Sequence, residues 1–246
     1  KLYIGATLGI PTINYYEYSE YTESETNDTN NLRKMEYSEE ISAYGTGYNL
    51  KVGVIYRVSE KIKIGGSIHT PTFFSIEEDY HTNITTFFKD STLNHPMGYR
   101  TPFNYNLITP LKASISASTI FNKNILISAE YEMIDYSSAK YFTSDFDTEN
   151  ETIATLYQKT GNIKVGAEMN IKPFILRAGY SKYGSAFANK DFSRENFSYG
   201  LGINNGGYYF DVAYVLSQVE NEYLSIEPIN LVNTNHNLIF TLGFRY

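Results

Sequence analysis

The stretch NIKVGAEMNI, residues 162–171, alternates strictly between two kinds of side chain. Every odd-numbered residue in it is apolar, and every even-numbered residue is polar, charged or glycine. Successive side chains of a β-strand point to opposite faces, so this period of two predicts a strand with one apolar and one polar face. The same alternation recurs in residues 49–57, 61–69, 111–119, 174–180 and 208–216 and in the last ten residues.

The whole pattern predicts an all-β chain of ten antiparallel strands. We expect them at residues 1–21, 33–59, 61–80, 101–120, 123–143, 155–172, 173–187, 194–204, 206–226 and 233–246. Short turns alternate with long polar loops, which is typical of an up-and-down meander, and such a meander loses its exposed edges when it closes into a barrel. No segment has a convincing amphipathic helix pattern. Residues 1–246 are therefore expected to form a single β-barrel domain.

Three features favour a transmembrane barrel over a soluble barrel or sandwich with an apolar interior. Several strands are longer than the ~9–11 residues that cross a bilayer. Apolar residues alternate up to a C-terminal tyrosine, which resembles the terminal signature of bacterial outer-membrane barrels. Many charges share the polar face, where a dry core would make them prohibitively costly and a wet lumen would not. These charged residues are Lys51, Arg57, Lys112, Glu130, Glu132, Lys164, Glu168, Arg177, Asp211 and Arg245.

Composition agrees with this interpretation. The 246 residues include 24 tyrosines and 15 phenylalanines, and rings of this kind suit the aromatic girdles at a membrane interface. Segments 17–40, 145–151 and 220–227 together carry a net charge of −13, so with −7 for the whole chain the remainder is +6. We expect acidic extracellular loops, with the short turns and both termini of this chain periplasmic. The acidic balance argues against nucleic acid as a partner, and the absence of cysteine excludes thiolate chemistry.

The chain resembles the FadL-type outer-membrane transport proteins, in the version common among Bacteroidetes. The stretches that carry the resemblance are KLYIGATLGIP (1–11), GTGYNLKVGVIYR (45–57), IHTPTFF (68–74), YNLITPLKASISAS (105–118), ISAEYEMIDYSSAKY (127–141), TGNIKVGAEM (160–169), LRAGYSKYGS (176–185) and TLGFRY (241–246). The resemblance implies a fourteen-stranded barrel that takes up hydrophobic compounds such as long-chain fatty acids. It also implies an N-terminal helical hatch.

This chain departs from that family pattern in two ways. It has ten expected strands instead of fourteen, and nothing in it resembles the hatch. We therefore expect it to be the C-terminal portion of a longer barrel, with a complete ten-stranded barrel as the alternative.

Prolines inside strand patterns point to a candidate site. Pro11, Pro71 and Pro110 share the polar face, although proline removes a ladder hydrogen bond and is normally avoided inside strands. Positions 71 and 110 are equidistant from the loop centred near residue 90, so they should face each other. We expect a bulge there that shapes the ligand lumen or a side opening, or one that merely ends regular pairing. The residues expected to line it are His69, Thr70, Pro71, Thr109, Pro110, Lys112, Glu130, Glu132 and Arg177.

Glu130 and Glu132 lie two residues apart on the same face and could in principle perform acid–base chemistry. We expect them instead to neutralise basic neighbours such as Lys112 or Lys164. The four histidines show no metal-ligand spacing, and no nucleophile elbow or phosphate loop is present. We therefore expect no catalytic residues, no metal and no cofactor.

Three functions are compatible with such a barrel. The first is passive uptake of a hydrophobic small molecule or fatty acid, with outer-membrane lipid around the barrel. The second is a structural or secretion-associated barrel that carries a protein partner. The third is an outer-membrane enzyme, for which His81 and His95 would need Asp79, Asp90 or Ser91 beside them. We favour the first.

Overall fold

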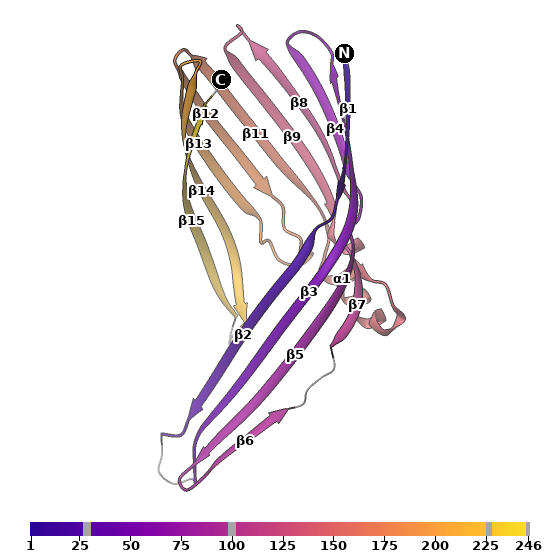
Figure 1. The fold of residues 1–246 in the computed structure, drawn as a ribbon, viewed down its shortest axis with the longest axis vertical. Helices are drawn as coiled ribbons and strands as arrows, with labels where there is room; N and C mark the ends of the chain where they lie inside the picture. Colours follow the sequence, from indigo (N-terminus) through magenta and orange to yellow (C-terminus); the bar gives the residue numbers. More distant parts are fainter. Residues whose placement is uncertain (27–30, 98–101, 225–227, 245–246) are drawn as a thin grey trace.

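The computed structural model describes residues 1–26, 31–97, 102–224 and 228–244. These residues form an antiparallel sheet that curves into a trough, with a short helix at its rim (Figure 1). The strands are β1 (Leu2–Gly9), β2 (Thr12–Ser24), β3 (Leu32–Arg57), β4 (Ile62–His69), β5 (Phe73–Phe88), β6 (Thr92–Met97), β7 (Phe103–Ile108), β8 (Lys112–Phe121), β9 (Ile125–Asp135), β10 (Lys140–Tyr141), β11 (Lys159–Ile171), β12 (Phe174–Tyr183), β13 (Arg194–Asn204), β14 (Tyr208–Leu224) and β15 (Pro228–Phe244). The helices are η1 (Tyr136–Ser138), η2 (Ser144–Phe146) and α1 (Asp147–Leu156).

The predicted up-and-down meander is confirmed. From β3 the sheet continues through β4, β8, β9, β11, β12, β13, β14 and β15, so successive passes of the chain are neighbours. Some passes are interrupted: β1 with β2, β4 with β5, and β7 with β8 each make one expected strand that breaks near its middle. Proline lies at all three breaks, at positions 11, 71 and 110, because a residue without an N–H cannot complete the ladder.

Several predicted boundaries are wrong. The expected loop 81–100 instead continues β5 to Phe88 and returns as β6, because β-branched and aromatic residues fill this segment. The final strand begins at Pro228, earlier than expected. The expected loop 144–154 contains α1, which the sequence pattern did not reveal. A tertiary contact stabilises α1, since the Asn150 side chain donates to the carbonyl of Tyr141 at 3.0 Å and accepts from its N–H at 2.8 Å.

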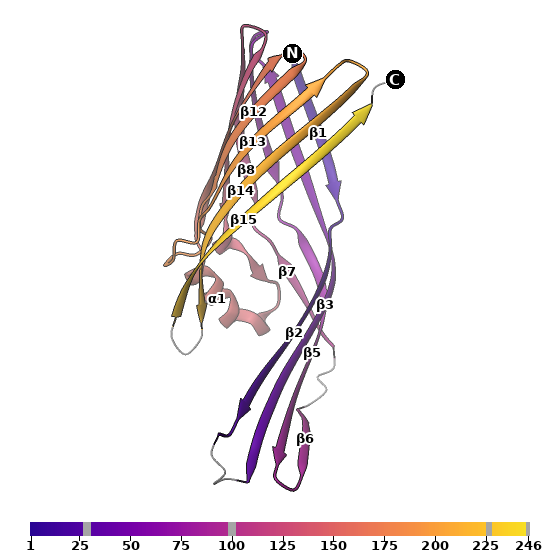
Figure 2. The same cartoon turned by 90° about the vertical axis from the view of Figure 1, so that its left-hand side faces the viewer.

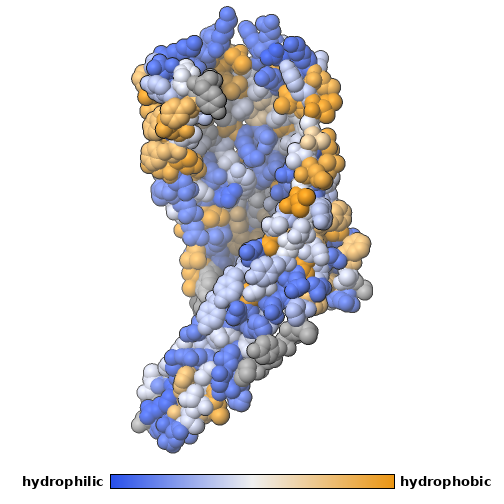
Figure 3. Space-filling model, in the orientation of Figure 1, coloured by the Kyte–Doolittle hydropathy of each residue, from blue (hydrophilic) through white to orange (hydrophobic). Residues whose placement is uncertain are grey.

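The two faces of the sheet differ as the alternation predicts. On β11, Ile163 and Val165 point outward with 47% and 43% of their surface exposed, whereas inward-facing Asn162 is 4% exposed. Figure 3 looks into the trough and shows hydrophilic residues along its hollow and hydrophobic residues along its flanks. The charged face is therefore the inner one and the apolar face the outer one. Of the charged residues expected on the inner face, Arg245 lies outside the described residues.

The sheet is an open trough. Within the described residues, β1 and β2 pair only with β3, and β15 pairs only with β14, so both edges are free. Figures 1 and 2 show the trough open between these two edges, with β2, β3, β5 and β6 projecting beyond it as a long ribbon. No helix in the described part of the chain is long and apolar enough to span a membrane.

Candidate functional site

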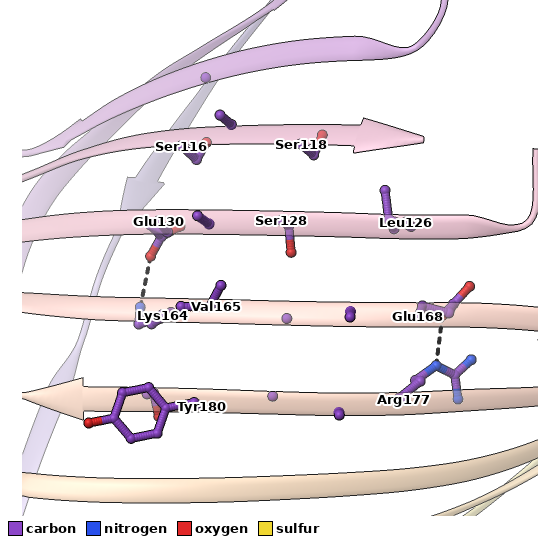
Figure 4. Close-up of a pocket in the computed structure, with 18 of the residues that line it drawn as sticks. Ser116, Ser118, Leu126, Ser128, Glu130, Lys164, Val165, Glu168, Arg177 and Tyr180 are labelled. Carbon is purple, nitrogen blue, oxygen red and sulfur yellow. Dashed lines mark hydrogen bonds and ion pairs between the residues drawn. The ribbon is translucent and has the colours of Figure 1, made fainter. Parts of the chain in front are cut away.

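The inner wall from β9 to β14 carries ion pairs between neighbouring strands (Figure 4). Lys164 Nζ lies 2.8 Å from Glu130 Oε1, and Arg177 Nε lies 2.7 Å from Glu168 Oε2. The two members of each pair lie directly opposite each other in the strand register, where opposite charges stabilise a sheet. Serine hydroxyls fill the wall between them, around a hollow of about 780 Å³. Charged and hydroxyl-bearing side chains line this hollow together with glycine and alanine.

Arg177 also bridges two strands that are not neighbours. Its Nη1 lies 2.5 Å from Asp211 Oδ1 on β14, although β13 separates the two. The residues of β13 at this level are Gly200 and Gly202, opposite Arg177 and Asp211 respectively. A Cβ on Gly202 would lie 2.1 Å from Asp211 Oδ1, so the bridge requires glycine there. The Arg177 guanidinium therefore connects a carboxylate on β11 with a carboxylate on β14. The glycines of β13 leave room for it to cross that strand.

The other residues expected on the inner face differ in their side-chain partners. Glu130 neutralises Lys164 as expected, whereas Glu132 accepts a hydrogen bond from Asn162 at 2.8 Å. Lys112 lies opposite His69 and has no ion-pair partner among the described residues. Arg177 lies farther along the wall with Glu168 and does not join the proline pair.

The register places Pro71 and Pro110 face to face. Phe73 pairs with Ile108 above them and His69 with Lys112 below, which leaves residues 70–72 opposite residues 109–111. We call these two segments the proline break. Residues 70–72 also face only two residues of β3, because Tyr48 pairs with Phe73 and Lys51 with His69. That extra residue makes a β-bulge.

Threonine hydroxyls accept hydrogen bonds from backbone N–H groups at the proline break. The N–H of Thr72 donates to Thr109 Oγ1 at 2.9 Å, and the N–H of Leu50 donates to Thr70 Oγ1 at 3.0 Å. The N–H of Thr109 donates to the carbonyl of Thr72 at 3.0 Å. A threonine before each proline therefore satisfies backbone donors that would otherwise be left unpaired inside the wall. The sheet therefore accommodates both prolines with these backbone donors paired.

Gly47 allows β3 to pass close to the proline break. A Cβ at this position would lie 2.6 Å from Phe74 Cδ1 and 2.7 Å from Thr72 Cγ2. We expect Gly47→Ala to lower the free energy of unfolding by about 1 kcal/mol, since overpacking forces neighbours to move. Gly5→Ala is the matched control, because nothing lies within 4 Å of its Cβ position. Urea unfolding of both variants measures the difference, and equal stabilities would contradict the close packing.

The outer side of the break is aromatic. Tyr48, Phe73 and Ile108 form one row across three strands, and Phe142 lies beside them around a hollow of about 280 Å³. Tyr48 and Phe73 are 58% and 57% exposed. The break therefore has an apolar groove outside and polar side chains inside.

A second apolar hollow lies at the rim, and the sequence pattern missed it because it missed α1. This rim hollow, of about 570 Å³, is formed by η1, β10 and α1 and is lined by Tyr136, Tyr141, Ile153, Leu156 and Tyr157, among others. Burial raises the pKa of the Tyr136 and Tyr141 hydroxyls, which stay protonated. Apolar residues at helical spacing in 153–157 are the signal that could have revealed it. The hollow suits a small apolar ligand.

Only one of the contacts considered for an enzyme is seen among the described residues. His81 Nε2 lies 3.5 Å from Asp79 Oδ2 on β5, but Ser91 lies beyond the far end of that strand. No cluster of three potential metal ligands occurs among the described residues.

Comparison with known proteins supports the architecture. No family model and no curated protein sequence matches the chain. Among solved structures, the P. putida toluene transporter TodX matches 100% of this chain with a TM-score of 0.62 and 11% identity, and the match spans 66% of TodX. A Pseudomonas aeruginosa FadL homologue matches 92% of this chain and 76% of its own at 11% identity, with a TM-score of 0.47. At such identity the likeness establishes the fold alone: the whole chain shares the fold of the matching part of TodX.

Proposed function

We propose that the protein belongs to an outer-membrane barrel of FadL type that conducts small hydrophobic compounds, long-chain fatty acids among them, by passive diffusion. The two-faced sheet is the observation that carries this proposal. A broad exposed apolar outer surface is unsuited to water and suits lipid, while the inner wall is charged and paired. TodX, which shares the fold, is a toluene transporter.

We also propose that further strands close the barrel. The free edges of β1 and β15 would leave backbone groups unpaired in a bilayer, which cannot hydrogen-bond them. In this arrangement the projecting ribbon and α1 face the exterior, and the short turns face the periplasm. The exterior placement agrees with the acidic character of the segments that project.

The rim hollow is the proposed place where a hydrophobic compound first binds. We expect the double variant Ile153→Asn, Leu156→Asn to slow uptake by roughly 10-fold, because polar side chains forfeit apolar contact with the ligand. The measurement is the initial rate of labelled toluene and labelled oleate entering vesicles that contain the full-length protein. Thr155→Asn, on an exposed part of the same helix, is the control. Uptake no faster than in protein-free vesicles would refute the proposed function.

A carrier role is the second candidate, and the ribbon favours it. One face of the ribbon carries five carboxylates, namely Glu20, Glu36, Glu40, Glu77 and Asp79. A charged surface held beyond the membrane suits a basic protein partner. Under the carrier role, deleting the ribbon would abolish binding of a basic protein partner. Failure of the intact protein to bind any such partner would count against that role.

A further inference from the structure

The outer face of β3, β5 and β7 changes from apolar to polar at one level, where the ribbon leaves the trough. These three strands lie side by side (Figure 1). The last apolar row across them is Tyr48, Phe73 and Ile108, which lie directly opposite one another. The next two outward rows are Thr46, Ser75 and Asn106, and then Tyr44, Glu77 and Asn104. We call these last six residues the head-group rows.

This change marks the level at which a bilayer surface crosses the three strands. Below it, the outward residues of β3 are Leu50, Val52 and Val54, each at least 40% exposed. Successive rows are about 6.6 Å apart along a strand, and the tilt of a barrel strand makes their difference in height smaller. The head-group layer on each side of a bilayer is about 5–7 Å thick. The first head-group row therefore lies within this layer, and the second lies at its outer boundary.

The hollow of about 280 Å³ beside the proline break spans this boundary. Its apolar side is formed by Tyr48, Phe73, Ile108 and Phe142, among others, and its polar side by Thr46, Ser75 and Asn106. We call this hollow the outer groove. Its strongly exposed aromatic rings and its polar margin match the two parts of one amphipathic lipid, the start of an acyl chain and the head group.

A single cation stands at the same boundary. Lys140 on β10 lies directly opposite Ile108, in the last apolar row. The next residue, Tyr141, faces inward with its ring 5.5 Å from that of Tyr105, so Lys140 faces outward. Lys140 is exposed and has no ion-pair partner among the described residues. A lysine at this depth extends its ammonium group into the head-group layer, where a phosphate is the matching anion.

The chemistry of the head-group rows favours a saccharide beside that phosphate. All of these residues except Glu77 are uncharged and carry a hydroxyl or an amide. Such groups both donate and accept hydrogen bonds, as sugar hydroxyls do. The Tyr44 ring is 59% exposed and offers a flat apolar surface for a sugar ring. Glu77 can accept hydrogen bonds from hydroxyls, whereas it would repel a second phosphate placed against it.

We infer that this outer surface binds a phosphorylated glycolipid of the surrounding membrane. Lys140 contacts the phosphate, the head-group rows contact the saccharide, and the outer groove holds the start of an acyl chain. The inference rests on the proposed function, because the outer face must lie in lipid. The site is separate from the lumen, so a compound in transit does not need to occupy it.

Native mass spectrometry of the full-length protein in non-ionic detergent tests the inference with three lipids. The probes are rough lipopolysaccharide, the same material after removal of its phosphates, and phosphatidylglycerol. We expect the wild-type protein to bind rough lipopolysaccharide about 10-fold more tightly than phosphatidylglycerol. Lys140→Gln should weaken binding of rough lipopolysaccharide by about 10-fold and change binding of the dephosphorylated form by less than about twofold.

A second variant tests the saccharide contacts separately. Asn104→Ala, Asn106→Ala should weaken binding of both forms of lipopolysaccharide by about 10-fold, because both carry the saccharide. Binding of phosphatidylglycerol should stay within about twofold of wild type. Both asparagines are exposed. If this variant weakens all three lipids equally, the head-group rows do not recognise a saccharide and the inference is wrong.

Matched variants separate these contacts from general effects. Lys61→Gln and Asn205→Ala change the same residue types at exposed turns and should leave binding of all three lipids unchanged. Lys140→Arg keeps the charge and should retain binding, which guards against a variant that fails to fold. If rough lipopolysaccharide and phosphatidylglycerol bind the wild-type protein equally while vesicle uptake persists, the inference is wrong and the proposed function stands. If no lipid binds and uptake is also absent, both are wrong.

Discussion

Ile115→Arg should lower the free energy of unfolding by about 2–4 kcal/mol, the cost of an arginine on the lipid face near the bilayer midplane. Ile115 lies near the middle of β8 and points outward with 66% of its surface exposed. In water such an exposed isoleucine would contribute little, and arginine there would be tolerated. The large expected effect therefore depends on the outer face lying in lipid. Urea unfolding of the full-length protein in lipid vesicles measures it.

The neighbouring residue provides the control. Ser116 faces inward at the same height and lies directly opposite Glu130, with which a new arginine can pair. Ser116→Arg should change the free energy of unfolding by less than about 1 kcal/mol, because opposed unlike charges contribute only ~0.2–1 kcal/mol. Equal losses from the two arginines would show that the outer face does not lie in lipid.

Arg177→Met should lower the free energy of unfolding by about 1–2 kcal/mol, because Glu168 and Asp211 lose their common partner. Removing one member of a fully buried pair costs about 3–5 kcal/mol, and the smaller value allows for solvent screening of a side chain that is 40% exposed. The triple variant Arg177→Met, Glu168→Gln, Asp211→Asn should recover part of this loss, since it leaves no unpaired charge.

Lys182→Met is the matched control for Arg177. Lys182, also on β12, pairs with Glu195 on the neighbouring strand β13 at 3.1 Å, but it is 45% exposed and joins only one carboxylate. Its removal should cost less than about 1 kcal/mol. If the two variants are equally stable, the bridge over β13 does not hold the wall together.

Local patterns were sufficient for much of the architecture. The alternation in residues 162–171 placed Ile163 and Val165 on one face and Lys164 on the other, and the structure has them so. Counting from the loop near residue 90 placed Pro71 opposite Pro110, which the register confirms. Both deductions need only the period of a strand and an antiparallel turn, which are properties of adjacent residues.

The features that local patterns missed depend on side-chain contacts between separate elements. Helix α1 has a weak pattern of its own and is held by Asn150 against Tyr141, so the rim hollow could not be expected without it. The Arg177–Asp211 contact crosses a strand, and it exists because glycines lie between them in register.

The sequence by itself determined the strand period, the two faces and the proline break, because side-chain direction in a strand follows from position alone. Only the tertiary structure decided the open edges, the rim hollow and which charges meet. Lys112 could have met Glu130 or Glu132 on β9, but the register set it opposite Ile134 on that strand and opposite His69 on β4. Whether two inward-facing charges attract or repel each other depends on that register, and several turns and one bulge together set it.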